Sequence, residues 1–280
     1  MKKLTIQDVQ KKKVQQQKIT MLTAYDFPMA QLLDQAGIDI VLVGDSLANV
    51  VQGLTSTKDV TFEDMLYHSQ LVRRAVKRAL VVGDMPFISY QVDTQNAVIH
   101  AKHFIEDARC DAVKVEWFDR CLDVVRDLRA ENIPVMGHVG LTPQTVENPA
   151  GFKVQGKDFS SAIKIIDQAQ QLQGQGCFAL VLECVPAELA KMITEQLDIP
   201  TIGIGAGAHC DGQVLVTNDL LGLTQGHKPK FVKRYVDLHA IMLETVHSFR
   251  AEVLNGIYPD REHSYSMKDD EWNRILKSTR

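Results

Sequence analysis

The chain has 280 residues, of which 45% are hydrophobic and 24% are charged, and its formal net charge is −4 at pH 7. This length suits one α/β barrel of about 250 residues, and the small net charge gives no reason to expect a nucleic-acid partner. No apolar run approaches the roughly 20 residues that cross a bilayer, and the basic N-terminus lacks the apolar segment of a secretory signal. We therefore expect a cytoplasmic protein without nucleic-acid or membrane partners.

The cysteines indicate the same compartment. They are odd in number and show no C-x-x-C spacing, which argues against both a disulfide framework and a zinc site. We expect reduced thiols at Cys110, Cys121, Cys177, Cys184 and Cys210. Because side chains alternate along a strand, Cys184 is expected to point away from its neighbour Glu183.

The first segment predicts an N-terminal helix that starts at Thr5 or Asp8. Ile6, Val9 and Val14 share one face of such a helix. A helix in this position is suited to plug the bottom of a barrel.

Eight short apolar runs follow, and each is typical of a buried parallel strand. They cover residues 19–25, 38–45, 80–86, 112–117, 134–140, 178–185, 201–206 and 220–224. Helical stretches are expected at 62–76 after Thr61, 95–108 after Thr94, 162–172 after Ser160 or Ser161, 187–197 after Pro186 and 212–219 after Asp211. This alternation predicts a closed (βα)8 TIM barrel, with an open doubly wound sheet as the alternative.

Two connections are long, residues 46–60 and 141–159. Both are expected on the top face of the barrel, where long loops commonly act as lids. No linker rich in Pro, Gly or Ser divides the chain. We therefore predict one catalytic domain over residues 1–265, including the N-terminal helix, and a C-terminal tail over residues 266–280.

Acidic residues end several of the predicted strands, which is where barrel enzymes place their catalytic groups. Asp45 and Asp84 each follow a glycine at a strand end, and Glu116 ends a third strand. A single aspartate in this position is commonly a helix cap. Two of them together with a glutamate predict a site for Mg²⁺, which keeps water ligands and accepts substrate oxygen atoms.

Three further residues at strand ends are candidates for chemistry. Lys114 and Glu116 face the same side of a strand, so Lys114 either binds a substrate carboxylate, forms a Schiff base or belongs to a structural ion pair. His138 either contacts a substrate or metal, or is a core histidine. Glu183 lies in an apolar stretch that would raise its pKa, which makes it the best candidate for a general base, with a ligand or ion-pair role as the alternative.

Taken together, these segments resemble the ketopantoate hydroxymethyltransferase family from about Ile19 to Ser264. The resemblance is carried by TAYD (23–26), LVGDSL (42–47), DMPF (84–87), VKVE (113–116), GHVGLTPQ (137–144), FKVQGK (152–157), LECVPAELAK (182–191), IGIGAG (202–207), DGQVLV (211–216) and PKFVK (229–233). GHVGLTPQ and LECVP in this order are the most specific of them.

The resemblance implies a (βα)8 barrel that uses Mg²⁺ and 5,10-methylenetetrahydrofolate. The family transfers a hydroxymethyl group to 3-methyl-2-oxobutanoate and gives 2-dehydropantoate, the first committed step of pantothenate and coenzyme A synthesis. It also implies a homo-oligomer, which in the family is often a decamer built from rings of dimers.

The resemblance also assigns roles to residues of this chain. It places the metal on Asp45 and Asp84, with Glu116 near it. Glu183 becomes the catalytic base that forms an enolate. The remaining roles are substrate contacts, which fall on Asp45, Ser46, Asp84, Lys114 and His138.

Two other functions and one further hypothesis stay open. A Mg²⁺-dependent lyase or mutase on 2-oxo acids, like the isocitrate lyase group, would use a similar barrel, but the chain lacks a K-K-C-G-H-like loop. A non-catalytic barrel is disfavoured by the cluster of mutually repelling carboxylates. A basic run contains Lys228, Lys230, Lys233 and Arg234. Such a run is ordinarily a solvated face, and the alternative is that it attracts a polyglutamyl folate tail.

Overall fold

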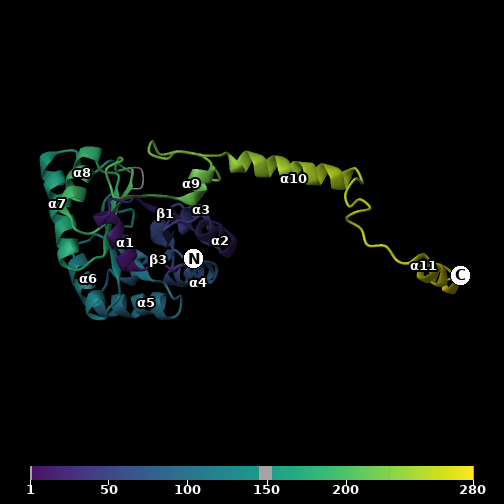
Figure 1. Cartoon of the computed structure of the whole chain (residues 1–280), viewed down its shortest axis with the longest axis horizontal. Coiled ribbons are helices and arrows are strands. Elements are labelled where there is room, and N and C mark those ends of the chain that lie inside the picture. The colour runs from purple at the N-terminus through teal and green to yellow at the C-terminus, as the bar shows by residue number, and fades with distance from the viewer. Residues whose placement is uncertain (1, 145–152, 227, 280) are drawn as a thin grey trace.

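The computed structural model describes residues 2–144, 153–226 and 228–279 and shows a barrel from which the C-terminal helices extend (Figure 1). Eight parallel strands close in chain order, with β8 paired to β1. They are β1 Ile19–Thr23, β2 Ile40–Val43, β3 Leu80–Asp84, β4 Ala112–Glu116, β5 Val135–Gly140, β6 Ala179–Glu183, β7 Thr201–Ile204 and β8 Gly212–Leu215. The predicted closed barrel is confirmed, and the open-sheet alternative is wrong.

Helices cover most of the outside of the barrel (Figure 1). They are α1 Ile6–Val14, α2 Phe27–Gln35, α3 Leu47–Val50, α4 Phe62–Ala75, α5 Thr94–Glu106, α6 Cys121–Ala130, α7 Phe159–Gly174, α8 Ala187–Gln196, α9 Thr217–Leu221, α10 Leu238–Leu254 and α11 Asp269–Ser278. Short 3-10 turns, η1 Thr57–Asp59 and η2 Phe87–Ser89, lie in the loops after β2 and β3. Thr61 caps α4 in a capping box with Asp64, as predicted.

Two predicted helix starts are displaced. Asp93 caps α5 and Asp158 caps α7, each through a carboxylate that accepts a backbone N–H of the first turn. Thr94 is therefore already inside α5, and Ser161 already inside α7. An aspartate just before each helix satisfies the free N–H groups, so the Thr and Ser hydroxyls are not needed as caps.

The prediction for the last βα unit is wrong. The segment after Asp211 forms β8 rather than a helix, and the expected strand at 220–224 overlaps the end of α9. Asp211 does not cap a helix, because its carboxylate accepts the Thr201 N–H (2.8 Å) and pairs with Lys13 (2.8 Å). Exposed Gln213 beside buried Val214 shows the two-residue alternation of a strand.

The two-residue period of the strands sorts the core into two sets of contacts. Outward residues such as Val113 and Val115 of β4 pack under the helices. Inward residues at the lower ends of the strands, such as Ala112, fill the barrel with apolar side chains. At the upper ends the inward positions are polar, including Lys114 and Glu116 of the same strand. The barrel therefore has an apolar floor beneath a charged mouth.

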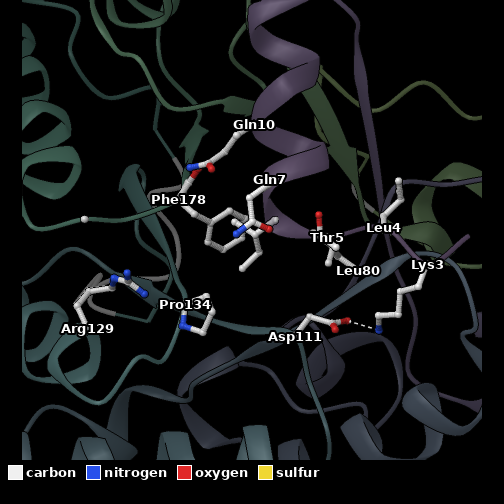
Figure 2. A pocket seen from close by; sticks show the side chains of 12 residues that line it. Lys3, Leu4, Thr5, Gln7, Gln10, Leu80, Asp111, Arg129, Pro134 and Phe178 are labelled. Atoms are coloured by element: carbon white, nitrogen blue, oxygen red, sulfur yellow. Dashed lines mark hydrogen bonds and ion pairs between the residues drawn. The ribbon is translucent and has the colours of Figure 1, made fainter.

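Helix α1 closes the bottom of the barrel. Val9 is fully buried and packs with the inward residues of the strands, among them Leu80 and Phe178. The helix is pinned by ion pairs around it, one of which joins Lys3 to Asp111 at 2.8 Å (Figure 2). The predicted N-terminal plug, with Thr5 as its cap, is confirmed. The prediction that Val14 shares the face of Val9 is wrong, because Val14 is 82% exposed and five residues turn it away from that face.

The C-terminal helices lie apart from the barrel. Helix α10 runs away from it, and α11 follows at the far end of an extended segment (Figure 1). Neither helix has a buried residue. Among the described residues, no helix combines the length and the apolar character needed to cross a membrane. The division into a domain at 1–265 and a tail at 266–280 stays a prediction.

The plug role of α1 predicts different effects for its two valines. Val9→Asp places a charge inside the apolar floor and should lower the free energy of unfolding by at least about 2 kcal/mol. Val14→Asp is the matched control, because this side chain is 82% exposed and its replacement should change stability by less than about 0.5 kcal/mol. Urea denaturation measures both. Equal stability of the two variants would contradict the plug.

Candidate active site

The carboxyl ends of the strands surround a cavity of about 430 Å³. Every site residue predicted from the sequence borders it: Asp45, Ser46, Asp84, Lys114, Glu116, His138 and Glu183. They come from the ends of β3 to β6 and from the turn after β2, and the barrel brings them together because the strands are parallel and in register. Asp84 is paired with Lys114, and Glu116 with His138, across neighbouring strands.

Lys114 joins the carboxylates in the floor of this cavity. Its ammonium group donates to Asp84 Oδ1 at 2.7 Å and lies 3.8 Å from Glu116 Oε1. Burial by itself would lower the pKa of Lys114, but Asp84, Glu116 and Asp45 outweigh it and raise the pKa above its ordinary value. The lysine is therefore a permanent cation, which does not suit a Schiff-base nucleophile, because that role needs a neutral amine.

The Asp45 carboxyl group has no hydrogen-bonded or ion-paired partner at one of its oxygen atoms among the described residues. Its backbone N–H donates to Asp84 Oδ2 at 3.2 Å, while its own Oδ2 is buried and, among the described residues, has no hydrogen-bond partner. Burial and the neighbouring carboxylates of Asp84 and Glu116 raise the pKa of Asp45 from its ordinary 3.8 to about 8. Burial also raises the pKa of Asp84. Such a carboxylate gains most from a nearby cation.

These carboxylates fit a hard divalent cation. Asp45 Oδ2 is buried and accepts no hydrogen bond, and Glu116 Oε1 also accepts none, although it lies 3.3 Å from His138 Nδ1 and 3.8 Å from Lys114 Nζ. Oxygen is the ligand that Mg²⁺ prefers. In the described part of the chain, no three or more His, Cys, Asp or Glu side chains converge closely enough to enclose a metal by themselves. The arrangement therefore suits an ion that keeps waters and accepts substrate oxygen atoms, as Mg²⁺ does, better than a closed protein cage.

His138 bridges two of the acids. Its Nδ1 lies 3.3 Å from Glu116 Oε1, and its Nε2 lies 3.3 Å from Glu183 Oε2, although neither contact has the angles of a hydrogen bond. Burial would lower the pKa of His138, but the two carboxylates outweigh it and raise the pKa to about 9. The imidazole is therefore protonated at neutral pH and links Glu183 to the Lys114 cluster.

Glu183 lies at the last position of β6, and its side chain is 17% exposed, more than the other acids of the floor. Cys184 follows in a left-handed conformation (φ 49°), which ends the alternation of the strand, so Cys184 also borders the cavity. The carbonyl of Glu183 accepts the Leu141 N–H (2.9 Å), and that of Cys184 accepts the Gln155 N–H (2.8 Å). Both described flanks of the loop after β5 are thus anchored beside Glu183.

Sequence reasoning missed a set of polar residues that hold the site from behind. The hydroxyls of Tyr25 and Ser46 lie 2.8 Å apart. Tyr90 donates to the Gln144 side chain at 2.8 Å, and the Gln144 backbone N–H donates to Glu116 Oε2 at 3.0 Å. Tyr25 and Gln144 lie inside the motifs TAYD and GHVGLTPQ, which mark the places but not these contacts.

Both loops that were predicted as lids supply residues to the wall of the cavity. The loop after β2 contains α3 and η1, and its Asn49 and Thr57 border the cavity. The loop after β5 is described at Leu141, Pro143 and Val154, which also border the cavity. Its central part, residues 145–152, lies outside the described residues.

Comparison with known families decides the assignment. The model of the family described as ketopantoate hydroxymethyltransferase matches residues 3–261. The chain belongs to this family. It transfers a hydroxymethyl group to 3-methyl-2-oxobutanoate, a step of pantothenate biosynthesis, and family membership implies methylenetetrahydrofolate as the co-substrate.

Individual members of the family are similar to this chain over nearly its whole length. The 3-methyl-2-oxobutanoate hydroxymethyltransferase of Syntrophomonas wolfei subsp. wolfei is 48% identical over 275 residues, which cover 98% of this chain and all of that protein. The enzyme of the same description from Thermoanaerobacter sp. strain X514 is 49% identical over 269 residues, covering 96% of this chain and 98% of that protein. Relatives this similar leave no place for the predicted alternative of a non-catalytic barrel.

Solved structures extend the likeness in fold alone. Phosphoenolpyruvate phosphomutase from Streptomyces platensis subsp. rosaceus has a TM-score of 0.61 at 13% identity, covering 98% of this chain and 99% of that one. 2,3-Dimethylmalate lyase, a member of the PEP mutase/isocitrate lyase superfamily, has a TM-score of 0.57 at 12% identity, covering 99% of this chain and 100% of that one. The alternative of a lyase or mutase on 2-oxo acids thus has only the shared barrel in its favour.

The raised pKa of Asp45 predicts that binding of Mg²⁺ depends on pH. Between 3.8 and about 8 the folded protein holds a proton on Asp45 that the unfolded chain has lost, so the metal-free protein loses stability as the pH rises through this range. The proton must leave before the carboxylate binds a metal, so Mg²⁺ affinity rises over the same range. We expect Mg²⁺ to raise the Tm more at pH 8 than at pH 6.

Thermal unfolding at the two pH values, with and without Mg²⁺, measures this difference. Asp45→Asn should abolish both the shift and its pH dependence. Asp59→Asn, a change on the exposed surface of η1, should preserve them. An equal Mg²⁺ shift at both pH values in the unchanged protein would refute the assignment to Asp45.

Proposed function

We propose that Glu183 is the general base that removes the C3 proton of 3-methyl-2-oxobutanoate, in a site whose other charged residues hold the 2-oxo acid and Mg²⁺. The observation that carries this proposal is the position of Glu183. Like Asp45 it forms no ion pair with Lys114, and unlike Asp45, which is buried, it remains partly open to the cavity. A carboxylate in that position reaches the substrate without giving up an ion pair with lysine.

The metal would be held by Asp45 and Asp84, with Glu116 near it through water. Bound there, Mg²⁺ supplies Lewis-acid stabilisation of the oxygen that becomes negative when the 2-oxo acid enolises. The unbonded buried oxygen atoms of Asp45 and Glu116 support this placement.

Lys114, Ser46 and His138 would orient the substrate. The ammonium of Lys114 balances the substrate carboxylate, since it is charged at all physiological pH values and lies in the cavity floor. The Ser46 hydroxyl, held by Tyr25, fixes the direction of the bound acid. A substrate oxygen would replace Glu116 Oε1 at Nδ1 of protonated His138, while Nε2 stays beside Glu183 Oε2 and keeps that carboxylate in place.

The chemistry then needs proton transfer to and from Glu183 and one new carbon–carbon bond. The C3–H bond breaks, its proton goes to Glu183, and its electron pair enters the enolate. Water adds to the methylene carbon of the folate, and cleavage of the carbon–nitrogen bond gives formaldehyde and tetrahydrofolate. The enolate carbon attacks the formaldehyde carbon, and the oxygen of the new hydroxymethyl group takes the proton from Glu183. The loops at 46–60 and 141–159 would limit the access of water while the bond forms.

Glu183→Gln tests the base. The amide keeps the shape of the side chain but cannot accept the proton, so deuterium exchange at C3 of 3-methyl-2-oxobutanoate in D₂O should slow by about 10²-fold or more. The bound 2-oxo acid should still raise the Tm of this variant in the presence of Mg²⁺. Proton NMR of the C3 signal gives the exchange rate.

Glu188→Gln on α8 is the matched control, because this glutamate is exposed and close in sequence. It should exchange at the rate of the unchanged enzyme. Normal exchange by Glu183→Gln would remove Glu183 from the role of base, whereas absence of exchange in the unchanged, metal-loaded enzyme would defeat the proposed function as a whole.

We also propose that the protein is a homo-oligomer in which α10 packs against a second copy. The connection from β7 to β8, residues 205–211, contains no helix, so the outside of the barrel is uncovered there. A groove of about 630 Å³ lies at this place, between residues of β1 and β8 such as Thr20 and Leu215 and the side chains of Phe231 and Tyr235.

Helix α10 has the properties of the missing cover. It leaves its own barrel, and it carries apolar side chains that are about half exposed, of which Met242, Val246 and Phe249 are spaced by four and three residues and share one face. An exposed apolar face of this kind and an uncovered groove on the same chain support reciprocal exchange between two copies. Residues 1–265 would then form a domain completed by its partner, with the tail at 266–280 outside it.

Phe249→Asp tests this contact. A charge on the exposed apolar face of α10 should shift the protein from an oligomer toward the monomer at micromolar concentration, which light scattering after size-exclusion chromatography measures. Ser248→Asp introduces the same charge at a neighbouring position and should leave the mass unchanged. A monomeric unchanged protein, or an oligomer that tolerates Phe249→Asp, would exclude an α10 interface.

We further place the reaction in the cytoplasm. All five cysteines are free and buried, and burial raises the pKa of the Cys121 and Cys184 thiols to about 12. Protonated, unpaired thiols are suited to a reducing compartment.

A further inference from the structure

One lysine outside the floor borders the acidic cavity, and three more are sequence neighbours of residues that line it. Lys230 borders the cavity directly, between Pro229 and Phe231, which border it as well. Lys228 stands on the other side of Pro229. Two more lysines adjoin residues of the wall on other loops, Lys58 beside Thr57 and Lys153 beside Val154. Lys230 thus adds a positive charge to the wall, which also contains the acid Asp219 of α9, and Lys58, Lys153 and Lys228 lie on the loops that supply lining residues.

These rim lysines, Lys58, Lys153, Lys228 and Lys230, are not used by the fold. All are exposed, and none forms an ion pair with a carboxylate of the described residues. The other cations of the same basic run are occupied elsewhere. Arg234 donates to the Thr224 carbonyl (3.2 Å) and lies 4.0 Å from Asp237, and Lys233 lies over the Tyr235 ring (4.6 Å). The run therefore divides into residues at the mouth and residues away from it.

We propose that the rim lysines, chiefly Lys228 and Lys230, bind the γ-linked polyglutamate tail of the folate co-substrate. This inference rests on the proposed function, because the reacting methylene group must approach the floor near Glu183. The pterin end of the folate then enters the cavity, and the glutamate end, at the opposite end of the molecule, points out through the mouth. There its carboxylates meet the lysines.

The chemistry at the mouth suits the whole outer half of such a ligand. Phe231 is half-buried in the wall beside Lys230 and offers a face against which the aminobenzoyl ring can pack. Each added glutamate brings one further carboxylate, and separate lysines on separate loops can meet successive carboxylates. A single-residue tail reaches few of them, so affinity should rise with the length of the tail.

Binding at equilibrium tests this without requiring turnover. Titration calorimetry compares the Kd of monoglutamyl and pentaglutamyl tetrahydrofolate on the Mg²⁺-loaded protein with 3-methyl-2-oxobutanoate present. An exposed ion pair contributes up to about fivefold in affinity, so several together should make the pentaglutamyl form bind about tenfold more tightly. Added salt should shrink this ratio, because exposed charges are screened.

Variants at the mouth locate the effect. In Lys228→Ala/Lys230→Ala the ratio of the two Kd values should fall to about two or less, and Lys228→Glu/Lys230→Glu should make the longer tail bind more weakly than the short one. Lys233→Ala removes the same charge from the same run but away from the mouth, and it should keep the ratio of the unchanged protein.

Equal Kd values for the two folates in the unchanged protein would overturn the proposal, and so would a ratio that survives in the double variants. Either result leaves the exchange of the C3 proton unaffected, because that reaction needs no folate. Absence of C3 exchange in the unchanged, metal-loaded enzyme would instead defeat the proposed function, whatever the two Kd values are, so the two failures are distinguishable.

Discussion

The pairing of one buried lysine with a ring of carboxylates is the interaction on which the site depends. Lys114 donates to Asp84 and approaches Glu116, and without its charge the acids in the floor of the barrel would repel one another in a poorly solvated space. The lysine does not balance all of them. Burial and the neighbouring acids raise the pKa of Asp45, and this unbalanced carboxyl group is the physical reason why we propose a metal ion there.

The barrel makes this arrangement possible through geometry that is independent of the chemistry. Parallel strands put every second side chain into the interior, and their register places Lys114 beside Asp84 and His138 beside Glu116. Apolar inward residues and the α1 plug fill the lower part, so charge is confined to the mouth. Toward the outside, Lys230 borders the same cavity, which is where the glutamate end of an extended folate would emerge under our proposal.

Much of the site could be read from the chain because the signals are local. A glycine and an aspartate at the end of an apolar run, or a lysine and a glutamate two positions apart on a strand, keep their meaning in any parallel barrel. The helix predicted after Asp211 was wrong because that prediction also used only local signals. An aspartate before a short mixed segment has the pattern of a helix cap, whereas the pairing of that segment with β1 and β7, which makes it a strand, is a contact between distant residues.

The sequence by itself determined the α/β class, most of the strands, the N-terminal helix and the identity of the residues at the strand ends. Only the tertiary structure decided that Tyr90 and Gln144 support Glu116, that His138 lies between two acids, that α10 stands away from its barrel and which lysines of the basic run face the mouth. The division has one cause. Propensity and periodicity are properties of neighbouring residues, whereas hydrogen bonds, shifted pKa values and uncovered surfaces arise when the chain closes on itself.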